Sequence, residues 1–233
     1  KGVAKEVWKK SLKKQAEGRL GPFKELWEVP LDQILLVPRF GVWELRAKGW
    51  RVRVIDDFKH NEANAAARVF ETATVDTADD VTVGIRALEA ALRSAGTGGR
   101  GSEPRTAVGL DGFVSAFKTI APAEDQRWLS WALVWDPTHE RCRVAELLAC
   151  PFGALGSVLG RHRVGAFWKT VLRQLFQILL YLYVDDGHVV DARCMEGQAQ
   201  RIFWEMISLA GWELDGEKSQ PMGARARLLG NDV

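Results

Sequence analysis

The most constraining feature of the sequence is the stretch Ile178–Val190, in which two apolar runs flank an Asp-Asp-Gly triplet. The first run ends at Asp185 and Asp186, and the second begins after Gly187. Two short apolar runs separated by turn-forming residues are typical of a β-hairpin. The stretch therefore predicts a hairpin with Asp185 and Asp186 at its tip. Either the triplet is only a good tight turn, because Asp and Gly tolerate positive φ, or the two carboxylates bind a divalent metal ion.

Bulk composition narrows the class of protein. At 233 residues the chain is long enough for one large domain or two small ones. A hydrophobic fraction of 47%, a charged fraction of 27% and a net charge of +2 are those of an ordinary globular protein, and neither require nor exclude a nucleic-acid partner. The irregular spacing of Cys142, Cys150 and Cys194 favours reduced thiols over a disulfide scaffold or a zinc site.

The sequence carries no membrane signal. The apolar stretch near residues 171–184 is interrupted by polar residues and is too short to span a bilayer, and the lysine-rich start has no signal-peptide pattern. We therefore expect an intracellular protein, in the nucleus or the cytoplasm, with no membrane partner. Because the chain begins at Lys1 and stops at Val233 in mid-pattern, we expect a fragment of a longer protein. The oligomeric state is left open.

Residues 1–17 predict a basic amphipathic helix, with Val3, Val7 and Leu12 near one face. Its candidate nucleic-acid contacts are Lys9, Lys10, Lys13 and Lys14. These lysines form either a solvated face or a surface that binds phosphates, because clustered lysines displace counterions from nucleic acid.

Arg51 and Arg53 alternate with valines, so both arginines project from one face of a predicted strand. Two guanidinium groups on one face suit a triphosphate or a nucleic-acid backbone. The alternative, which the sequence leaves open, is that the arginines pair with Glu44 or Asp56.

The rest of the chain alternates between helix and strand patterns. Residues 79–94 have apolar residues at helical spacing behind a cap at Thr77 or Asp79, and a Gly-rich linker, residues 95–102, follows. Residues 106–111 form a predicted strand that ends in the carboxylate of Asp111. Further predicted elements are a hairpin within 127–150, helices over 154–179 and 195–210, and short strands at 212–214 and 227–229. This order predicts an α+β fold that builds its site from converging strands.

The order of these parts resembles the fingers and palm of a reverse transcriptase, of the kind found in retrotransposons and retroviruses. The match runs from about Arg39 to Gly230 and rests on six segments of the sequence: Arg53 with Asp57-Phe58, Asp111 with Ser115-Ala116-Phe117, Pro151-Phe152-Gly153, Tyr183-Val184-Asp185-Asp186, Gly211-Trp212 through Lys218, and Leu229-Gly230. In sequence order, these segments resemble the family's fingers motif, which binds the incoming nucleotide, its four palm motifs and the start of its primer grip.

The resemblance implies a right-hand polymerase fold, with an antiparallel palm sheet packed on helices. Residues 1–105 would then be fingers-like, and residues 106–233 would be the palm, with a fingers-side hairpin near 127–150 and a truncation before the thumb. It also implies an RNA-directed DNA polymerase, a nucleotidyltransferase that extends the 3′-hydroxyl of a primer on an RNA or DNA template with dNTPs.

The resemblance also assigns roles to single residues. Catalysis falls to Asp111, Asp185, Asp186 and Lys218, of which the three carboxylates would hold two Mg²⁺ ions, with Mn²⁺ as an alternative. The nucleotide-binding residues would be Arg51, Arg53, Phe117, Phe152, Gly153 and Tyr183, with Phe117 as the steric gate against ribose. Leu229 and Gly230 would contact nucleic acid, as would the four lysines near the N-terminus.

The chain departs from the family pattern at the first palm motif. Ser115-Ala116-Phe117 stands one residue further from Asp111 than the family's pattern has it. Either a residue is inserted in the turn after the strand, or the carboxylate is displaced. Two other functions therefore stay open: a catalytically inactive polymerase-like scaffold that binds nucleic acid, and an RNA-directed RNA polymerase, against which Phe117 argues if it is the gate.

Overall fold

The computed structural model describes residues 2–46, 49–68, 70, 72–96, 105–195, 197–228 and 231–232. Most of the predicted Gly-rich linker lies outside them, as do the predicted nucleic-acid contacts Leu229 and Gly230. The chain folds into two compact units: the first contains Lys1–Thr72 and Phe117–Gly160, and the second contains Ala73–Ala116 and Arg161–Val233. The chain thus passes from one unit to the other three times. The sequence analysis placed a division between residues 105 and 106 and assigned a hairpin near 127–150 to the fingers side; in the structure, residues 117–160 belong to the same unit as residues 1–72.

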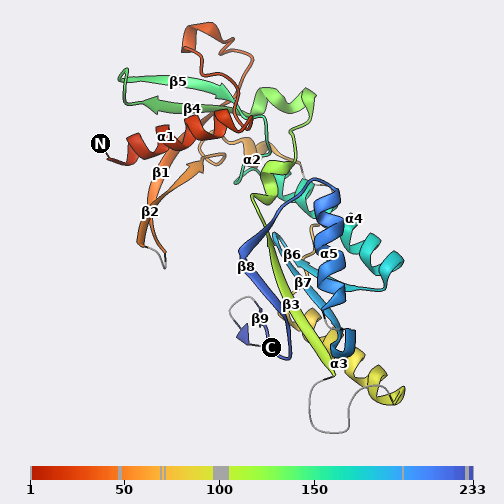
Figure 1. The fold of residues 1–233 in the computed structure, drawn as a ribbon. Helices are drawn as coiled ribbons and strands as arrows, with labels where there is room; N and C mark the ends of the chain where they lie inside the picture. Colours follow the sequence, from red (N-terminus) through yellow and green to blue (C-terminus); the bar gives the residue numbers. More distant parts are fainter. Residues whose placement is uncertain are drawn as a thin grey trace. The chain divides into compact units, whose positions relative to one another are not determined.

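The first unit is built on a four-stranded sheet with the order β2-β1-β4-β5 (Figure 1). β1 (Leu36–Arg46) pairs antiparallel with β2 (Gly49–Asp56) and parallel with β4 (Trp131–Asp136), which forms a hairpin with β5 (Arg141–Glu146). The hairpin predicted within 127–150 is therefore confirmed. Because β4 pairs with β1, this hairpin belongs to the N-terminal sheet although it lies far along the chain.

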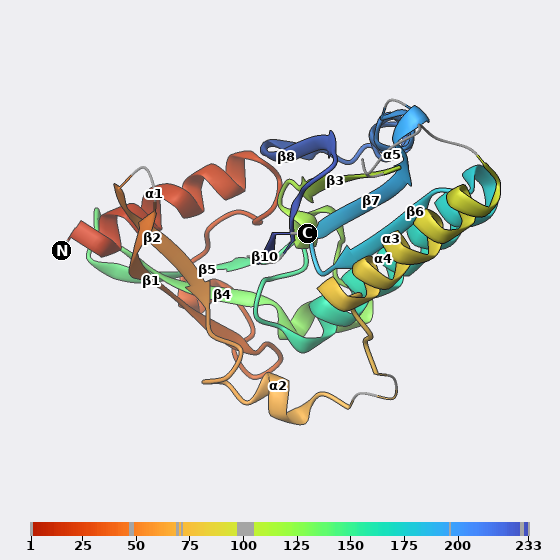
Figure 2. The ribbon, with the colours of Figure 1, turned by 90° about the horizontal axis from the view of Figure 1, so that it is seen from below.

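Helix α1 (Gly2–Ala16) packs on this sheet (Figure 2). Its buried Val7 lies in one apolar cluster with Val52 of β2 and Val134 of β4. Gly41 of β1 allows the close approach, because a Cβ atom there would lie 2.7 Å from Val7 and 2.6 Å from Val52. Val3 and Val7 of the predicted apolar face thus pack on the sheet, whereas Leu12, predicted on the same face, is 43% exposed.

The second unit is built on the antiparallel sheet β6-β7-β3-β8. Its strands are β3 (Thr106–Phe113), β6 (Leu179–Tyr183), β7 (Asp186–Ala192) and β8 (Leu214–Gly223). Helix α4 (Leu155–Phe176) starts in the first unit and leads into β6, and α5 (Gln198–Leu209) connects β7 to β8. The order β3-α4-β6-β7-α5-β8 is a split β-α-β arrangement.

The two faces of this sheet are covered by different helices. Leu180 and Val189 belong to the core cluster that contains Leu172 of α4 and Phe203 of α5. The alternate residues Tyr181 and Val190 pack instead with α3 (Ala78–Ser94). Since successive side chains of a strand point to opposite faces, α4 and α5 cover one face and α3 covers part of the other.

The predicted mixture of helices and antiparallel strands is confirmed. The helix predicted over 79–94 is α3, which Thr77 caps through the backbone N–H of Asp80, and the helices predicted over 154–179 and 195–210 are α4 and α5. Of the strand predicted at 212–214, only Leu214 lies in a strand, as the first residue of β8. The remaining elements are short: α2 (Ala63–Ala66), β9 (Arg227–Leu228), β10 (Asn231–Asp232) and the 3₁₀ turns Leu26–Glu28, Ala116–Thr119, Glu124–Leu129 and Arg193–Met195.

The helices and the cysteines bear on the expected class of the protein. None of the helices within the described ranges is long and apolar enough to cross a membrane. Cys142, Cys150 and Cys194 are free in the structure.

Candidate functional site

The predicted hairpin with the two carboxylates is formed by β6 and β7. Tyr183 pairs with Asp186, so the turn itself consists of Val184 and Asp185, and Asp186 is the first residue of β7. Val184 has a φ of 53°. A β-branched residue is strained in this left-handed region, and such strain tends to occur at functional sites. The turn that presents the two adjacent carboxylates therefore depends on a backbone conformation of Val184 that valine does not favour.

Lys218 of β8 joins the carboxylate pair. Its Nζ lies 3.5 Å from Oδ2 of Asp185 and 3.7 Å from Oδ1 of Asp186. Burial and then the neighbouring Asp185 carboxylate raise the pKa of Asp186 above its usual value of 3.8, and Lys218 partly offsets both effects. Three of the four predicted catalytic residues are thus brought together, and their charges are partly balanced within the protein. Tyr183 is partly exposed at the end of β6, next to this turn.

Asp111, the fourth predicted catalytic residue, is not brought to this cluster. Its side chain is fully buried and accepts hydrogen bonds from three donors. Oδ1 accepts from Trp204 Nε1 at 2.9 Å and from Ser219 Oγ at 2.7 Å, and Oδ2 accepts from Gln200 Nε2 at 2.9 Å. Trp204 and Gln200 belong to α5, so Asp111 points to the face of the sheet that α5 covers.

The residue beside the pair is Gly112. It lies opposite Asp186 in the β3–β7 register, and paired residues share a face of the sheet. A Cβ atom at Gly112 would lie 3.2 Å from Oδ1 of Asp186 and 2.5 Å from Cδ of Lys218. On the face that carries the pair, β3 therefore has a glycine at the position where a third carboxylate would complete a metal site. Asp111 precedes this glycine by one residue and so points to the opposite face of the sheet.

These residues do not fit a pair of Mg²⁺ ions. Two-metal sites are bridged by carboxylates from separate strands, whereas Asp185 and Asp186 are neighbours and the only carboxylate of β3 points to the other face. An ammonium group also occupies the space beside the pair. Within the described part of the chain, no group of three or more His, Cys, Asp or Glu side chains is placed to hold a metal ion.

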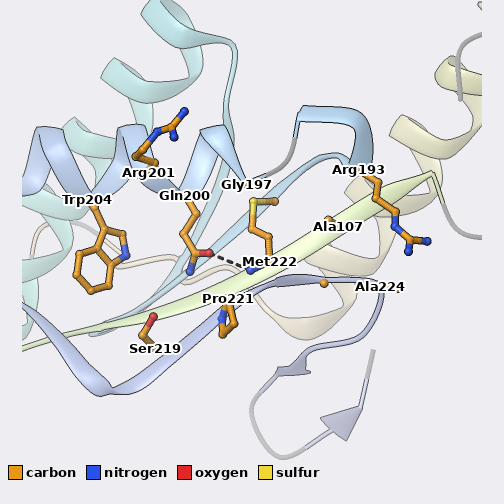
Figure 3. A pocket seen from close by; sticks show the side chains of 11 residues that line it. Ala107, Arg193, Gly197, Gln200, Arg201, Trp204, Ser219, Pro221, Met222 and Ala224 are labelled. Carbon is orange, nitrogen blue, oxygen red and sulfur yellow. Dashed lines mark hydrogen bonds between the residues drawn. The ribbon is translucent and has the colours of Figure 1, made fainter.

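A cavity of about 680 Å³ lies over the Asp111 network, between α5 and β8 (Figure 3). Trp204, Gln200 and Ser219, which all bind Asp111, are part of its lining. Gln200 also accepts a hydrogen bond from the backbone N–H of Met222 at 3.0 Å, and Figure 3 shows Arg201 pointing away from β8. The polar groups at the base of this cavity are therefore engaged with the protein itself.

The first unit gathers several of the predicted nucleotide-binding residues around a smaller cavity of about 140 Å³. Arg53 and Phe152 line it, and the Arg53 guanidinium lies 5.2 Å from the centre of the Phe152 ring. Further lining comes from Lys14, Arg19, Arg39 and Asp56. Four cationic side chains and one carboxylate give this lining an excess of positive charge, which favours an anionic ligand.

Arg39 and Asp56 form the buried ion pair of this cavity. Nε and Nη2 of Arg39 donate to the two carboxylate oxygens of Asp56 at 2.6 and 3.0 Å. Arg51, in contrast, donates from Nε to Glu44 at 2.9 Å and does not line the cavity. Of the two interpretations left open for the arginines, pairing with Glu44 describes Arg51, whereas Nη1 of Arg53 lies 3.8 Å from Oε1 of Glu44.

The turn Pro151–Gly153 and the predicted gate Phe117 lie beside Arg53 in the same unit. Phe117 is nearly buried and packs edge-on against Phe152, with the ring centres 5.6 Å apart. Gly153 has a φ of 105°, which favours glycine, and its carbonyl accepts a hydrogen bond from Asn64 Nδ2 at 2.7 Å. Asn64 also accepts from the backbone N–H of Leu155 at 2.9 Å, so it fixes the turn that starts α4.

The lysines of α1 divide into two groups. Lys9 and Lys13 are exposed, together with Lys5, at intervals of four residues, which places the three on one face of the helix. Lys10 donates to the backbone carbonyl of Val52, and Lys14 lines the 140 Å³ cavity. The exposed face suits a phosphate backbone, while Lys10 helps to hold α1 on the sheet.

Sequence reasoning missed one charged side chain in the second unit, Arg161 of α4. It is only 1% exposed, and its guanidinium stacks 4.2 Å from the ring centre of Phe113 and 5.1 Å from that of Trp212. Burial lowers its pKa to about 10, and the Asp185 carboxylate acts in the opposite direction. No periodicity in the sequence distinguishes this arginine from an exposed one, because its burial depends on the two aromatic side chains that tertiary structure brings to it.

Comparison of the sequence with models of known protein families gives no match, and comparison with curated proteins gives none either. The assignment of function therefore rests on the sequence motifs and on the geometry of the two units.

Proposed function

We propose that this chain is the fingers and palm region of a reverse-transcriptase-type polymerase domain and that it holds primed nucleic acid. The observation that carries the proposal is the cluster of Asp185, Asp186 and Lys218. Asp185 and Lys218 belong to two different sequence motifs and lie 33 residues apart in the sequence. The resemblance assigned both motifs to one palm site. The split β-α-β order of the second unit, with the pair at the turn between two strands, is in keeping with that assignment.

The nucleic-acid part of the proposal is supported by the first unit. The basic cavity beside Arg53 and Phe152 combines guanidinium groups with an aromatic ring, which suits the phosphates and the base of a nucleotide. The exposed lysines of α1 offer a separate surface for a phosphate backbone. The partner is accordingly an RNA or DNA template with its primer, and dNTPs are the expected nucleotides.

A second candidate function is RNA-directed DNA synthesis itself, and the strained turn at Val184 favours it because it presents an intact carboxylate pair. This candidate needs a third carboxylate beside the pair. Since a shift of β3 by one residue reverses the direction of every side chain, such a shift would bring Asp111 to the place that Gly112 holds. This shift would break three buried hydrogen bonds to Asp111 and would therefore reduce the stability of the second unit.

The two functions differ in nucleotide addition and share the binding step. Binding is measured by fluorescence anisotropy with a labelled DNA primer annealed to an RNA template, and addition by primer extension with Mg²⁺ and dNTPs. We expect salt-sensitive binding without extension. Extension that is lost in Asp185→Asn would establish the second candidate, and a chain that neither binds nor extends would contradict both.

A further inference from the structure

The charge balance around Asp185 and Asp186 is provided by the protein. The first internal cation is Lys218, whose Nζ contacts both carboxylates at 3.5 and 3.7 Å. The pair and Lys218 are only partly exposed, with 31–46% of each side chain accessible. A cation fixed at this distance acts on Asp186 in the direction that a bound metal ion would, because Lys218 lowers the pKa of that carboxyl against the opposing effects of burial and Asp185.

Gly112 allows Lys218 to reach the pair. A Cβ atom at residue 112 would lie 2.5 Å from Cδ and 3.3 Å from Cβ of Lys218. Any side chain at this position would therefore compete with the aliphatic part of Lys218 for the same space. The glycine at residue 112 and the position of Lys218 beside the pair are thus two aspects of one arrangement.

Arg161 is a further, buried cation of the second unit. Its Nε, Nη1 and Nη2 have no hydrogen-bond partner among the residues that the structure describes. A buried guanidinium is costly unless other interactions compensate for its lost hydration. Two interactions do so here: the guanidinium stacks between Phe113 and Trp212, and the negative charge of Asp185 attracts it.

We infer that Lys218 is a built-in counter-cation of the Asp185–Asp186 pair, and that it takes the place of a divalent metal ion which a polymerase centre would bind. The inference rests on the proposed function only for the comparison with a polymerase; the charge balance stands on the geometry of the second unit. It predicts that Lys218 and a divalent cation exclude each other at the pair, because both would occupy the same face of β3 and β7.

The test measures Mn²⁺ binding to the purified chain from the electron paramagnetic resonance signal of the free ion, with circular dichroism as the control for folding. Lys218→Met keeps the aliphatic stem and removes the charge that competes with the metal ion. The Kd for Mn²⁺ should therefore fall at least about tenfold, which corresponds to about 1.4 kcal/mol of binding free energy. Lys218→Arg keeps the charge and should bind Mn²⁺ as the unmodified chain does. Lys218→Ala removes the Cδ atom that a side chain at residue 112 would meet, so adding Gly112→Asp to Lys218→Ala should tighten Mn²⁺ binding further, whereas adding Gly112→Ala should not.

The results separate the inference from the proposed function. Equal Mn²⁺ affinity in the unmodified chain and Lys218→Met, or weaker binding in the variant, would overturn the inference whatever the chain does with nucleic acid. A chain that fails to bind primed template but shows the effect of Lys218→Met would overturn the proposed function and leave the counter-cation role supported.

Discussion

Trp204 donates its indole Nε1–H to Oδ1 of Asp111 at a distance of 2.9 Å. This bond ties α5 to β3, and the bonds of Asp111 with Gln200 and Ser219 add a second contact with α5 and one with β8. A carboxylate that the sequence analysis assigned to metal binding therefore connects three elements of the second unit. Its role in this structure is to hold the sheet and the helix together.

The first prediction concerns this network. Asp111→Asn replaces an acceptor oxygen by an NH₂ group that must face one of three donors, so one buried bond is lost and a donor is left unpaired. We expect a loss of about 2–4 kcal/mol in the free energy of unfolding, measured by urea denaturation. The matched control is Asp185→Asn at the partly exposed turn, which should cost less than about 1 kcal/mol. Equal losses in the two variants would contradict the structural role of Asp111.

The sequence predicted the elements better than the directions of their side chains. The β6–β7 hairpin, α3 and the β4–β5 hairpin follow from local patterns and caps, which tertiary contacts reinforce. The orientation of Asp111 does not follow from such a pattern. Nearly every residue of β3 is buried, so the strand has no alternation of polar and apolar residues that would reveal which face Asp111 takes.

The same distinction between local patterns and tertiary contacts applies to the residues of the candidate site. Asp185, Asp186 and Lys218 could be predicted because their motifs have characteristic spacing. Arg161 could not, since its burial depends on Phe113 and Trp212, which lie 48 and 51 residues away in the sequence. Division of the chain into units also depends on long-range pairing, namely that of β4 with β1, which no local signal encodes.

The second prediction separates Arg53 from Arg51. Arg53→Ala removes a guanidinium from the basic cavity, whereas Arg51→Ala removes one that is bound to Glu44 outside it. We expect the Kd of a nucleoside triphosphate to rise about tenfold in Arg53→Ala and to stay within about twofold in Arg51→Ala, as calorimetric titration would measure. Similar effects in both variants would indicate a general loss of positive charge and would count against a specific site at Arg53.

The third prediction concerns the lysine face of α1. Replacing Lys9 and Lys13 together by Gln removes two exposed positive charges and leaves Lys10 and Lys14 in their contacts. If both lysines bind phosphates, the slope of log K against log [salt] for primed template should decrease by about 1.4–1.8. Replacing the exposed Lys24 and Lys59 by Gln is the matched control, because it removes the same charge from elsewhere in the first unit. A slope that changes equally in both double variants would rule out a localised contact on α1.

The last prediction uses the pH dependence of Glu89, whose carboxylate joins α3 to the start of β3. Its Oε1 accepts from the backbone N–H groups of Arg105 and Thr106 at 2.6 and 2.9 Å, and from the Thr106 hydroxyl at 3.0 Å. Burial alone would raise the pKa of Glu89, but these hydrogen bonds outweigh it and hold the pKa below the usual value of 4.5. The folded protein therefore binds this proton less readily than the unfolded chain does, so the stabilisation is present above pH 4.5 and is lost as the pH falls through the lower folded value.

Glu89→Gln removes the charge and keeps an acceptor oxygen in nearly the same place. At pH 7 we expect the variant to be less stable than the unmodified chain by about 1–2 kcal/mol, because hydrogen bonds to a carboxylate are stronger than those to an amide. As the pH falls below 4.5, the two unfolding free energies should converge, since the unmodified Glu89 then takes up a proton and loses the same advantage. Urea denaturation of both proteins across this range measures the difference directly. A difference that stays constant with pH would show that the ionised carboxylate of Glu89 contributes nothing specific to the junction between α3 and β3.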